Sequence, residues 1–210
     1  MAGMRMKTGI RGGLAGLVVL LAMPAAAMAQ DAVAAAAYGA LSLSPPTTEG
    51  LTVCHGFGCQ YRAELGISAA DQAALRKLLA AGSGSAAKER QAVAAAGAWF
   101  DKRMAQVAGT AGHVARANRD YMYDKRQFDC IDTSRNTTSL LLLLQELGLL
   151  RYHTVAAPEA RGHIFDLKAP HATAVLVEKE TGVKWSVDAW TRAYGQAPEI
   201  MTLDRWMESD

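Results

Sequence analysis

The sequence has no uninterrupted apolar run long enough to cross a membrane comfortably. Its most apolar stretch, residues 12–23, is followed at once by Pro24, whereas a membrane-spanning helix needs about 20 apolar residues. Three basic residues precede this stretch: Arg5, Lys7 and Arg11. A small-x-small motif, Ala27-Met28-Ala29, follows it. This order is typical of a secretory signal peptide, so we predict one over residues 1–29, with an uncleaved anchor as the alternative.

The chain also lacks a strong excess of charge of either sign. It has 22 basic and 20 acidic side chains, and the predicted signal peptide holds three of the basic ones and no acidic one. The 181 residues that remain carry 19 basic and 20 acidic side chains. Binding to nucleic acid needs a basic patch, so the composition gives no support for a nucleic-acid partner. This length is enough to bury a core as one domain.

Cysteine is scarce, with three residues in the whole chain. Cys54 and Cys59 bracket the short segment CHGFGC, whose two glycines permit a tight loop. In an oxidising compartment we expect these two cysteines to form a disulfide. Metal binding together with His55 is the alternative, although no second ligand pair occurs at zinc spacing. Cys130 is then the odd cysteine of an exported chain, which makes it a candidate reactive thiol.

Two units follow the predicted signal peptide. Residues 30–50 are rich in alanine and then polar, with two consecutive prolines, and we expect a flexible leader there. Residues 51–210 are predicted to form a single domain. The chain contains no internal repeat and no coiled-coil heptads, which argues against repeat and fibrous architectures.

Within this domain, predicted helices precede predicted strands. Ser68, with Asp71 three residues later, forms an approximate capping box, and Ser85 can cap a second helix. We expect helices over residues 69–81, 86–107 and 130–147, the last of which ends at Gly148. Strands are expected over 51–54, 152–156, 171–177 and 183–190, with a connection over 158–170, a hairpin turn over 178–182 and a short helix over 203–207. Helices followed by an antiparallel sheet predict an α+β fold.

The third predicted helix begins at Cys130. Unpaired backbone N–H groups and the helix dipole favour negative charge at a helix N-terminus. We therefore expect a lowered pKa for this thiol, and the thiolate is the nucleophilic form. The first turns of the helix are polar, whereas the run from Leu140 to Leu144 is apolar. This pattern is typical of a helix whose body is buried and whose N-terminus opens into a cleft.

A cysteine nucleophile needs a base, and the base needs an orienting group. His171 starts one predicted strand, and Asp188 ends the next, 17 positions later, with the turn near the middle. Antiparallel pairing brings both residues to the same end of the hairpin. We therefore predict a triad of Cys130, His171 and Asp188. The alternative is a buried core cysteine, a histidine that only makes hydrogen bonds and an aspartate that caps a turn.

This part of the chain resembles the transglutaminase-like superfamily and is nearest to the bacterial transglutaminase-like cysteine proteinases. The resemblance covers residues 127–190, and its matching pieces are Cys130-Ile131-Asp132, the LLQELGL segment of residues 143–149, Pro170-His171-Ala172 and Trp185-Ser186-Val187-Asp188. It implies a papain-like α+β fold in which Cys130 is the nucleophile, His171 the base and Asp188 the orienting group. Phe128-Asp129-Cys130 is also similar to the start of NlpC-type cell-wall endopeptidases, but these favour a histidine as the third member.

The resulting expectation is an exported cysteine hydrolase or acyl transferase, periplasmic or secreted, that acts on peptide or isopeptide amides through a thioester. It uses no cofactor and no metal, and its partner is a protein or peptide, including cell-wall peptides. A catalytically inactive binding domain is the alternative. The backbone N–H of Cys130 would hold the oxyanion, with a second donor from one of four side chains: Trp99, Tyr121, Tyr123 or Gln127. We expect Asp132 to cap the helix, and three histidines to be surface or structural residues: His113, His153 and His163.

Overall fold

The computed structural model describes Met1, residues 25–162 and residues 170–209, and within the first helix it describes side chains from Asp31 onward. The helices are α1 (Ala25–Tyr38), α2 (Ala69–Ala80), α3 (Ala86–Ala108), α4 (Cys130–Glu146) and α5 (Leu203–Glu208). The strands are β1 (Gly50–His55), β2 (Tyr61–Gly66), β3 (His153–Arg161), β4 (His171–Glu178), β5 (Lys184–Asp188) and β6 (Glu199–Thr202). Helix and sheet are mixed, as an α+β fold requires.

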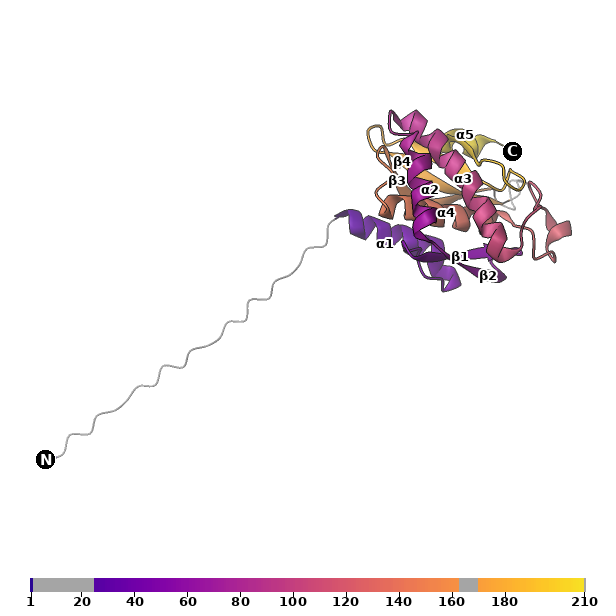
Figure 1. The fold of residues 1–210 in the computed structure, drawn as a ribbon, viewed down its shortest axis with the longest axis horizontal. Coiled ribbons are helices and arrows are strands. Elements are labelled where there is room, and N and C mark those ends of the chain that lie inside the picture. The colour runs from indigo at the N-terminus through magenta and orange to yellow at the C-terminus, as the bar shows by residue number, and fades with distance from the viewer. Residues whose placement is uncertain (2–24, 163–169, 210) are drawn as a thin grey trace.

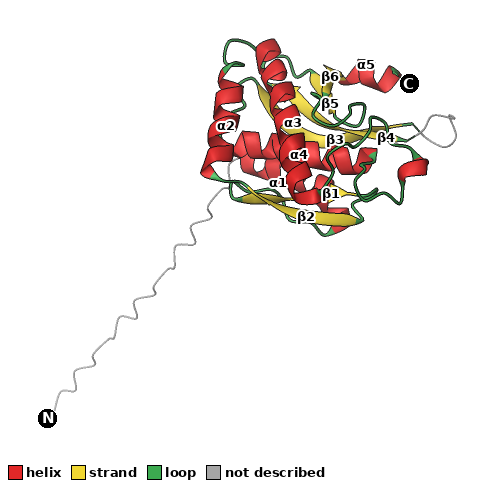
Figure 2. Ribbon diagram, turned by 45° about the vertical axis from the view of Figure 1, so that its right-hand side comes forward, coloured by secondary structure: helices red, strands yellow, loops and turns green. Residues whose placement is uncertain are grey.

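The main sheet is antiparallel with the strand order β3-β4-β5-β6, and β1 and β2 form a separate hairpin. Side chains of β4 alternate between the two faces of the sheet. Ala174 and Leu176 join the large core that holds the leucines of α4, whereas Val175 packs with Leu203 and Trp206 of α5. Figures 1 and 2 show α2 and α3 side by side on the α4 side of the molecule, with α5 near the β5–β6 end of the sheet.

Helix α4 occupies the centre of the core. The five leucines from Leu140 to Leu144 are each at most 2% exposed, because the helix contacts β3, β4 and β5 as well as β1 and α3. A helix that is apolar all round is stable only when neighbours surround it. The predicted bounds, from Cys130 to a stop at Gly148, are confirmed, and Gly148 has the left-handed φ of 69° that ends many helices.

The first two predicted helices of the domain are also confirmed. Ser68 and Asp71 form a full capping box at the start of α2, and Ser85 caps α3 by accepting from the N–H of Lys88. Gly97 of α3 lies where a Cβ would come within 2.6 Å of the Pro198 ring. This close approach gives a reason for glycine inside a helix, where it otherwise costs about 1 kcal/mol relative to alanine.

The prediction of a flexible leader over residues 30–50 differs from the structure. Helix α1 covers residues up to Tyr38 and packs on β3 and α4. Its buried residues are Val33, Ala34, Ala37 and Tyr38, and the Tyr38 hydroxyl lies 2.7 Å from the Ser139 hydroxyl. The alanine-rich composition suggested a tether, but small side chains allow a helix to approach its neighbours closely. The predicted cleavage after Ala29 falls inside α1 and would keep these buried residues.

The predicted bounds of one strand were wrong, and two further strands were missed. Strand β3 continues to Arg161, so residues 158–161 belong to it and not to a connection. A register shift between Ala156 and Glu159 marks a bulge next to Pro158, which has no N–H to donate. Strands β2 and β6 were not predicted, because β2 is largely exposed and β6 has only four residues. His163, which was expected to be a surface or structural residue, lies outside the described part of the chain.

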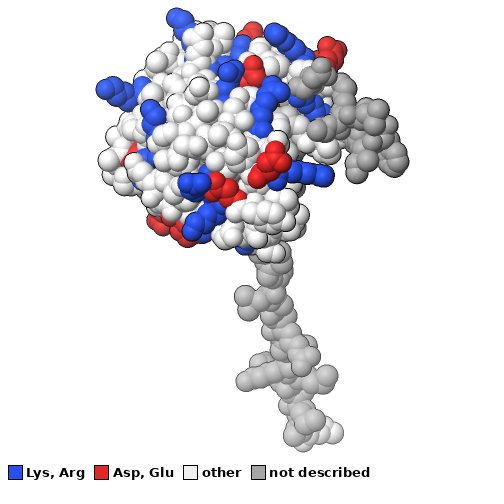
Figure 3. All heavy atoms as spheres, turned by 90° about the vertical axis from the view of Figure 1, so that its right-hand side faces the viewer, with Lys and Arg blue, Asp and Glu red and all other residues white. Residues whose placement is uncertain are grey.

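Within the described residues, no helix is long and apolar enough to cross a membrane. Figure 3 shows one face of the molecule, on which basic side chains are separated by uncharged surface and lie beside acidic ones. They do not form one continuous block on this face.

Candidate active site

Cys130 is the first residue of α4, as predicted. Asp129 is the N-cap, and its carboxylate accepts a 2.7 Å hydrogen bond from the N–H of Asp132. The Asp132 carboxylate in turn accepts from the N–H of Asp129 at 3.3 Å, which completes a capping box. The expected capping role of Asp132 is therefore confirmed. The helix start that carries the thiol is fixed by two reciprocal hydrogen bonds.

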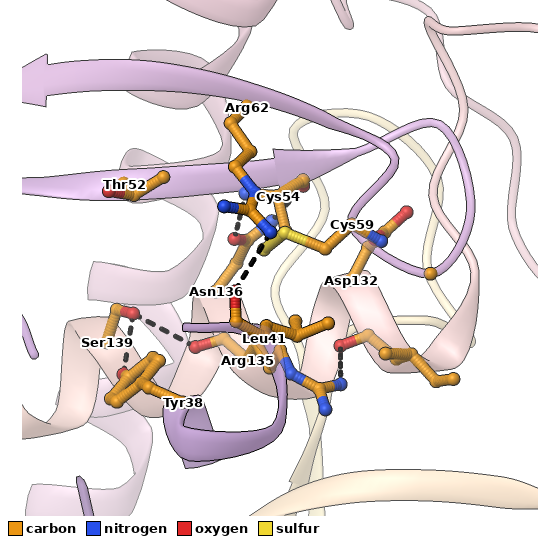
Figure 4. The surroundings of a disulfide bond; sticks show 12 residues. Tyr38, Leu41, Thr52, Cys54, Cys59, Arg62, Asp132, Arg135, Asn136 and Ser139 are labelled. Carbon is orange, nitrogen blue, oxygen red and sulfur yellow. Dashed lines mark hydrogen bonds between the residues drawn. A yellow bond between two sulfur atoms is a disulfide. The ribbon is translucent and has the colours of Figure 1, made fainter. Parts of the chain in front are cut away.

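The loop between Cys54 and Cys59 docks on this helix start. The two cysteines form the predicted disulfide, which removes both thiols from any metal site. Two backbone N–H groups donate to the Asp132 carboxylate, Phe57 at 2.8 Å and Cys59 at 2.6 Å. The N–H of Gly58 donates to Asp129 at 2.8 Å. Figure 4 shows Asp132 reaching from α4 toward the Cys59 end of the loop.

The backbone conformation of the loop explains this convergence of donors. Residues 56–59 all have positive φ, including Phe57 at 70° and Cys59 at 60°. Successive N–H groups in such a conformation point into one concavity and bind anions. A second contact lies one turn further along α4, where the Asn136 amide bonds both the N–H and the C=O of Cys54 at 2.8 Å. The disulfide loop therefore holds the first two turns of α4 through side chains of the helix.

The two aspartates at the helix start do not ionise alike. Asp132 is fully buried, and burial together with the negative charge of Asp129 raises its pKa to about 7. The N–H groups of Cys59, Phe57 and Asp129 oppose this rise by bonding to the carboxylate. The charge of this cap therefore changes near neutral pH.

His171 and Asp188 meet as the hairpin register predicts. Ala174 of β4 pairs with Val187 of β5, so both residues come to the same end of the sheet. The His171 Nε2 lies 2.6 Å from the Asp188 Oδ2. Burial by itself raises the pKa of Asp188, but hydrogen bonds from His171, the Trp206 indole and the Trp190 N–H outweigh it and lower the pKa. Asp188 is therefore a carboxylate that accepts the Nε2 proton.

The other ring nitrogen of His171 has a different environment. Its Nδ1 is buried and has no hydrogen-bond partner among the described residues. The ring lies between two indoles, 4.7 Å from Trp190 and 5.3 Å from Trp206 by ring centroids. With Nε2 donating to Asp188, Nδ1 carries the lone pair of a neutral imidazole. The packing and the carboxylate thus leave the second ring nitrogen of His171 without a partner among the described residues.

The Cys130 thiol lies against the backbone on both sides of His171. Its Sγ is 3.9 Å from the Pro170 carbonyl oxygen, and it accepts a hydrogen bond from the N–H of Ala172. The structure therefore brings the three predicted residues into one site. Cys130 is half-buried, whereas His171 and Asp188 are 5% and 2% exposed.

The expected lowering of the thiol pKa is wrong. Burial raises the pKa of Cys130 and is the largest influence, and the charges of Asp129 and Asp188 raise it further. The N–H groups of Ala172 and of Cys130 itself act in the opposite direction but do not outweigh these effects. Helix position alone misled the prediction, because it ignored the burial of the thiol, the adjacent carboxylate of Asp129 and the carboxylate of Asp188, which the fold brings near. The resting thiol is thus neutral and needs a base.

The four candidates for a second oxyanion donor have different surroundings. Trp99 lines a groove between α2 and α3, and Tyr121 and Tyr123 are exposed. Gln127 is buried, and its side-chain oxygen accepts from the N–H of Val114. None of the four has a described contact with Cys130 or His171.

The remaining histidines of the described residues are held by structural partners. His113 bonds Asp101 at 2.9 Å, His153 bonds Glu89 at 2.8 Å, and His55 donates to the Lys125 carbonyl at 2.6 Å. No group of three or more potential metal ligands occurs in the described part of the chain.

Sequence reasoning missed the two tryptophans of the site. The Trp206 indole N–H donates to Asp188 Oδ2 at 2.9 Å, and Trp190 packs on His171 while its backbone N–H bonds Asp188. Trp190 stands two residues after Asp188, and Trp206 lies in the predicted terminal helix. The signal that could have revealed a buried contact is a large aromatic residue, Trp206, in an otherwise polar tail.

Comparison with protein-family models, with curated proteins and with solved structures found no match to this chain. The functional argument therefore depends on the geometry of the site.

Proposed function

We propose that the chain is an exported cysteine hydrolase of the transglutaminase-like kind, with a papain-like core. It acts on peptide or isopeptide amides in the periplasm or outside the cell. The proposal depends on how three residues are arranged. Asp188 bonds Nε2 of His171, and Nδ1 has no partner among the described residues. The Cys130 thiol lies against the residues that flank His171. The disulfide supports export, because disulfides persist in oxidising compartments.

The proposed reaction starts from a neutral thiol and a neutral imidazole. Nδ1 of His171 takes the proton from Cys130 as the sulfur attacks the amide carbonyl. Asp188 holds the ring through Nε2–H and stabilises the imidazolium that forms. The backbone N–H of Cys130 donates to the oxyanion. The imidazolium then protonates the departing amine, and a thioester remains on Cys130.

The second half-reaction releases the acyl group. His171, neutral again, takes a proton from water as the water oxygen attacks the thioester carbonyl. The Cys130 sulfur leaves and regains the proton, which yields a carboxylic acid and free enzyme. An amine in place of water gives acyl transfer by the same steps.

The test has two parts. Alkylation of Cys130 by iodoacetamide is followed by mass spectrometry from pH 5 to 10, in the wild type and in His171→Ala. Amine release is then measured with an unfolded protein substrate and with purified peptidoglycan. Base assistance predicts faster alkylation of the wild type near neutral pH and loss of that advantage in His171→Ala. A Cys130 that reacts only after unfolding would contradict the proposal.

A second candidate is a catalytically inactive binding domain of the same fold. The raised pKa of the Cys130 thiol favours it, because a protonated thiol is a poor nucleophile. Cys130→Ser separates the two candidates. It abolishes turnover if the thiol does chemistry, and it leaves the biological effect unchanged in a binding domain. Activity on peptidoglycan but not on unfolded protein would point to a cell-wall endopeptidase.

A further inference from the structure

A cavity of about 230 Å³ lies where β5, β6 and α5 meet, and Asp188 forms part of its wall. Three arginines line it: Arg116, Arg161 and Arg205. They come from the connection before α4, from the end of β3 and from α5. These positions are far apart in the sequence, so the gathering of three guanidinium groups is a product of the tertiary fold.

The acidic groups at this cavity already have partners. Asp188 accepts from His171 and Trp206, and Glu199 pairs with Arg192 at 3.3 Å. The other Glu199 oxygen lies 3.4 Å from the Thr191 hydroxyl. Both carboxylates on the wall are therefore bonded to groups other than the three arginines.

The arginines differ in how firmly they are held. Arg161 lies over the Trp206 ring, 4.5 Å from its centroid, and donates to the Ser209 hydroxyl at 2.6 Å. Arg116 and Arg205 have no ion-pair partner among the described residues. The cavity is therefore bordered by the guanidinium groups of Arg116 and Arg205, which have no ion-pair partner among the described residues. Its third guanidinium group, that of Arg161, is held in place by Trp206 and Ser209.

The planar guanidinium group matches carboxylate and phosphate oxygens with two parallel hydrogen bonds. The cavity is also smaller than the roughly 300–1,000 Å³ of sites for drug-sized ligands. We propose that this cavity binds a small oxyanion group, a carboxylate or a phosphate, held by Arg116 and Arg205 against the wall formed by Arg161. The proposal is separate from the proposed amide hydrolysis, because it concerns binding and not turnover.

Isothermal titration of the mature chain tests the proposal with three probes: inorganic phosphate, a tripeptide with a free C-terminal carboxylate, and the same tripeptide as its C-terminal amide. We expect phosphate or the free tripeptide to bind and the amide not to bind. Binding of phosphate alone identifies a phosphate group as the ligand, and binding of the free tripeptide alone identifies a carboxylate.

Arg116→Ala and Arg205→Ala are each expected to weaken binding about tenfold, because each removes a charge-assisted contact. Arg76→Ala is the matched control, since Arg76 is an exposed arginine of α2 outside the cavity. Circular dichroism and thermal unfolding check that each variant is folded. An equal loss in Arg76→Ala would overturn the proposal, because it would show unspecific charge attraction.

Two further variants complete the design. Cys130→Ala must bind the probes as the wild type does, so a failed search for enzyme activity leaves this test intact. Asp210→Asn is included because Asp210 follows Ser209 in the sequence and has a carboxylate side chain. Absence of binding by phosphate and by the free tripeptide in both the wild type and Asp210→Asn would overturn the proposal.

Discussion

His171 of β4 and His153 of β3 each bond a buried carboxylate, and the two pairs have different surroundings. His171 bonds Asp188 at 2.6 Å through Nε2, and its Nδ1 has no partner among the described residues. His153 of β3 bonds Glu89 at 2.8 Å through Nδ1, and its Nε2 accepts from Arg90 at 3.1 Å. The two rings therefore have opposite neutral tautomers. A histidine with both nitrogens engaged stabilises the fold, whereas one with a free nitrogen can move a proton.

Glu89 and Asp188 also differ in the groups that donate hydrogen bonds to them. Glu89 accepts from the backbone N–H groups of Arg151, Tyr152 and His153 as well as from the ring. It thus fixes the start of β3 to α3, and Arg90 extends the network to Glu178 at 2.7 Å. Asp188 instead takes donors from the ring, from Trp206 and from one backbone N–H. Its partners orient a ring and do not anchor a strand.

The largest expected effect separates the two histidines directly. His171→Ala should reduce the proposed amide hydrolysis by about 10³-fold, within the range known for a lost general base, and should also lower stability, because it removes a buried partner of Asp188. His153→Ala should remove the imidazole partner of the buried Glu89, leave that carboxylate with backbone donors alone, and lower the free energy of unfolding by about 3 kcal/mol without a comparable loss of turnover. Turnover and urea unfolding of both variants check this. Equal catalytic losses in folded samples of both would erase the distinction between the pairs.

The second prediction concerns the carboxylate of the structural pair. Burial by itself raises the pKa of Glu89, but the hydrogen bonds from His153 and from the backbone N–H groups outweigh it and lower the pKa. A lowered folded pKa gives stability that is present above the unfolded pKa, near 4.3, and is lost as the pH falls through the folded value. Glu89→Gln should be less stable by about 2 kcal/mol at pH 7 and should lose less stability on acidification. Urea unfolding at pH 7 and pH 3.5 measures both; parallel losses in the two proteins would contradict the assignment.

A third prediction tests how the disulfide loop supports the N-terminal end of α4, which carries Cys130. The double variant Cys54→Ser/Cys59→Ser should lower the free energy of unfolding by about 2 kcal/mol, as the entropy of a short closed loop predicts. Because this loop bonds Asp129 and Asp132, the variant should also slow alkylation of Cys130 in the folded protein. Ser85→Ala, which removes the cap of α3, is the control that costs about 1 kcal/mol without touching Cys130. Unchanged alkylation in the disulfide variant would show that the loop does not position the thiol.

Asp132 adds a pH dependence of opposite sign. Its folded pKa of about 7 lies above the unfolded value, so its contribution to stability is fully present below the unfolded pKa and is lost as the pH rises through about 7. Asp132→Asn should remove this decline in stability between pH 4 and pH 7. Thermal unfolding across that range measures it, and an unchanged pH dependence in the variant would rule out Asp132 as its source.

The smallest expected effect concerns the role of the Asp188 carboxylate in the proposed reaction. Trp206→Phe keeps the aromatic packing on His171 but removes the indole N–H that bonds Asp188. We expect turnover to fall less than tenfold, because Asp188 keeps His171 and the Trp190 N–H as donors. The loss of this donor to Asp188 should also shift the pH dependence of the turnover rate. A loss as large as that of His171→Ala would instead indicate that Trp206 holds the ring in place.

Several elements were predictable because their signals are local. Ser68 and Asp71 form a capping box within one turn, and the apolar run of α4 shows which helix is buried. The pairing of β4 with β5 followed from a short turn between them, and it placed His171 opposite Asp188. Strands β2 and β6 were missed, since an exposed or very short strand carries no apolar alternation to detect.

The sequence alone predicted the α+β class, the Cys54–Cys59 disulfide and the pairing of His171 with Asp188, because each depends on local spacing or on one hairpin register, whereas the packing of α4 on the sheet brings Cys130 to the same site. Only the tertiary structure decided the charge state of the site. Burial and Asp188, both supplied by the fold, add to the effect of the adjacent Asp129 and raise the pKa of the Cys130 thiol. The two tryptophans enclose His171 from distant positions. Electrostatic energy depends on distance and on exclusion of water, and neither quantity is encoded in the spacing of residues along the chain.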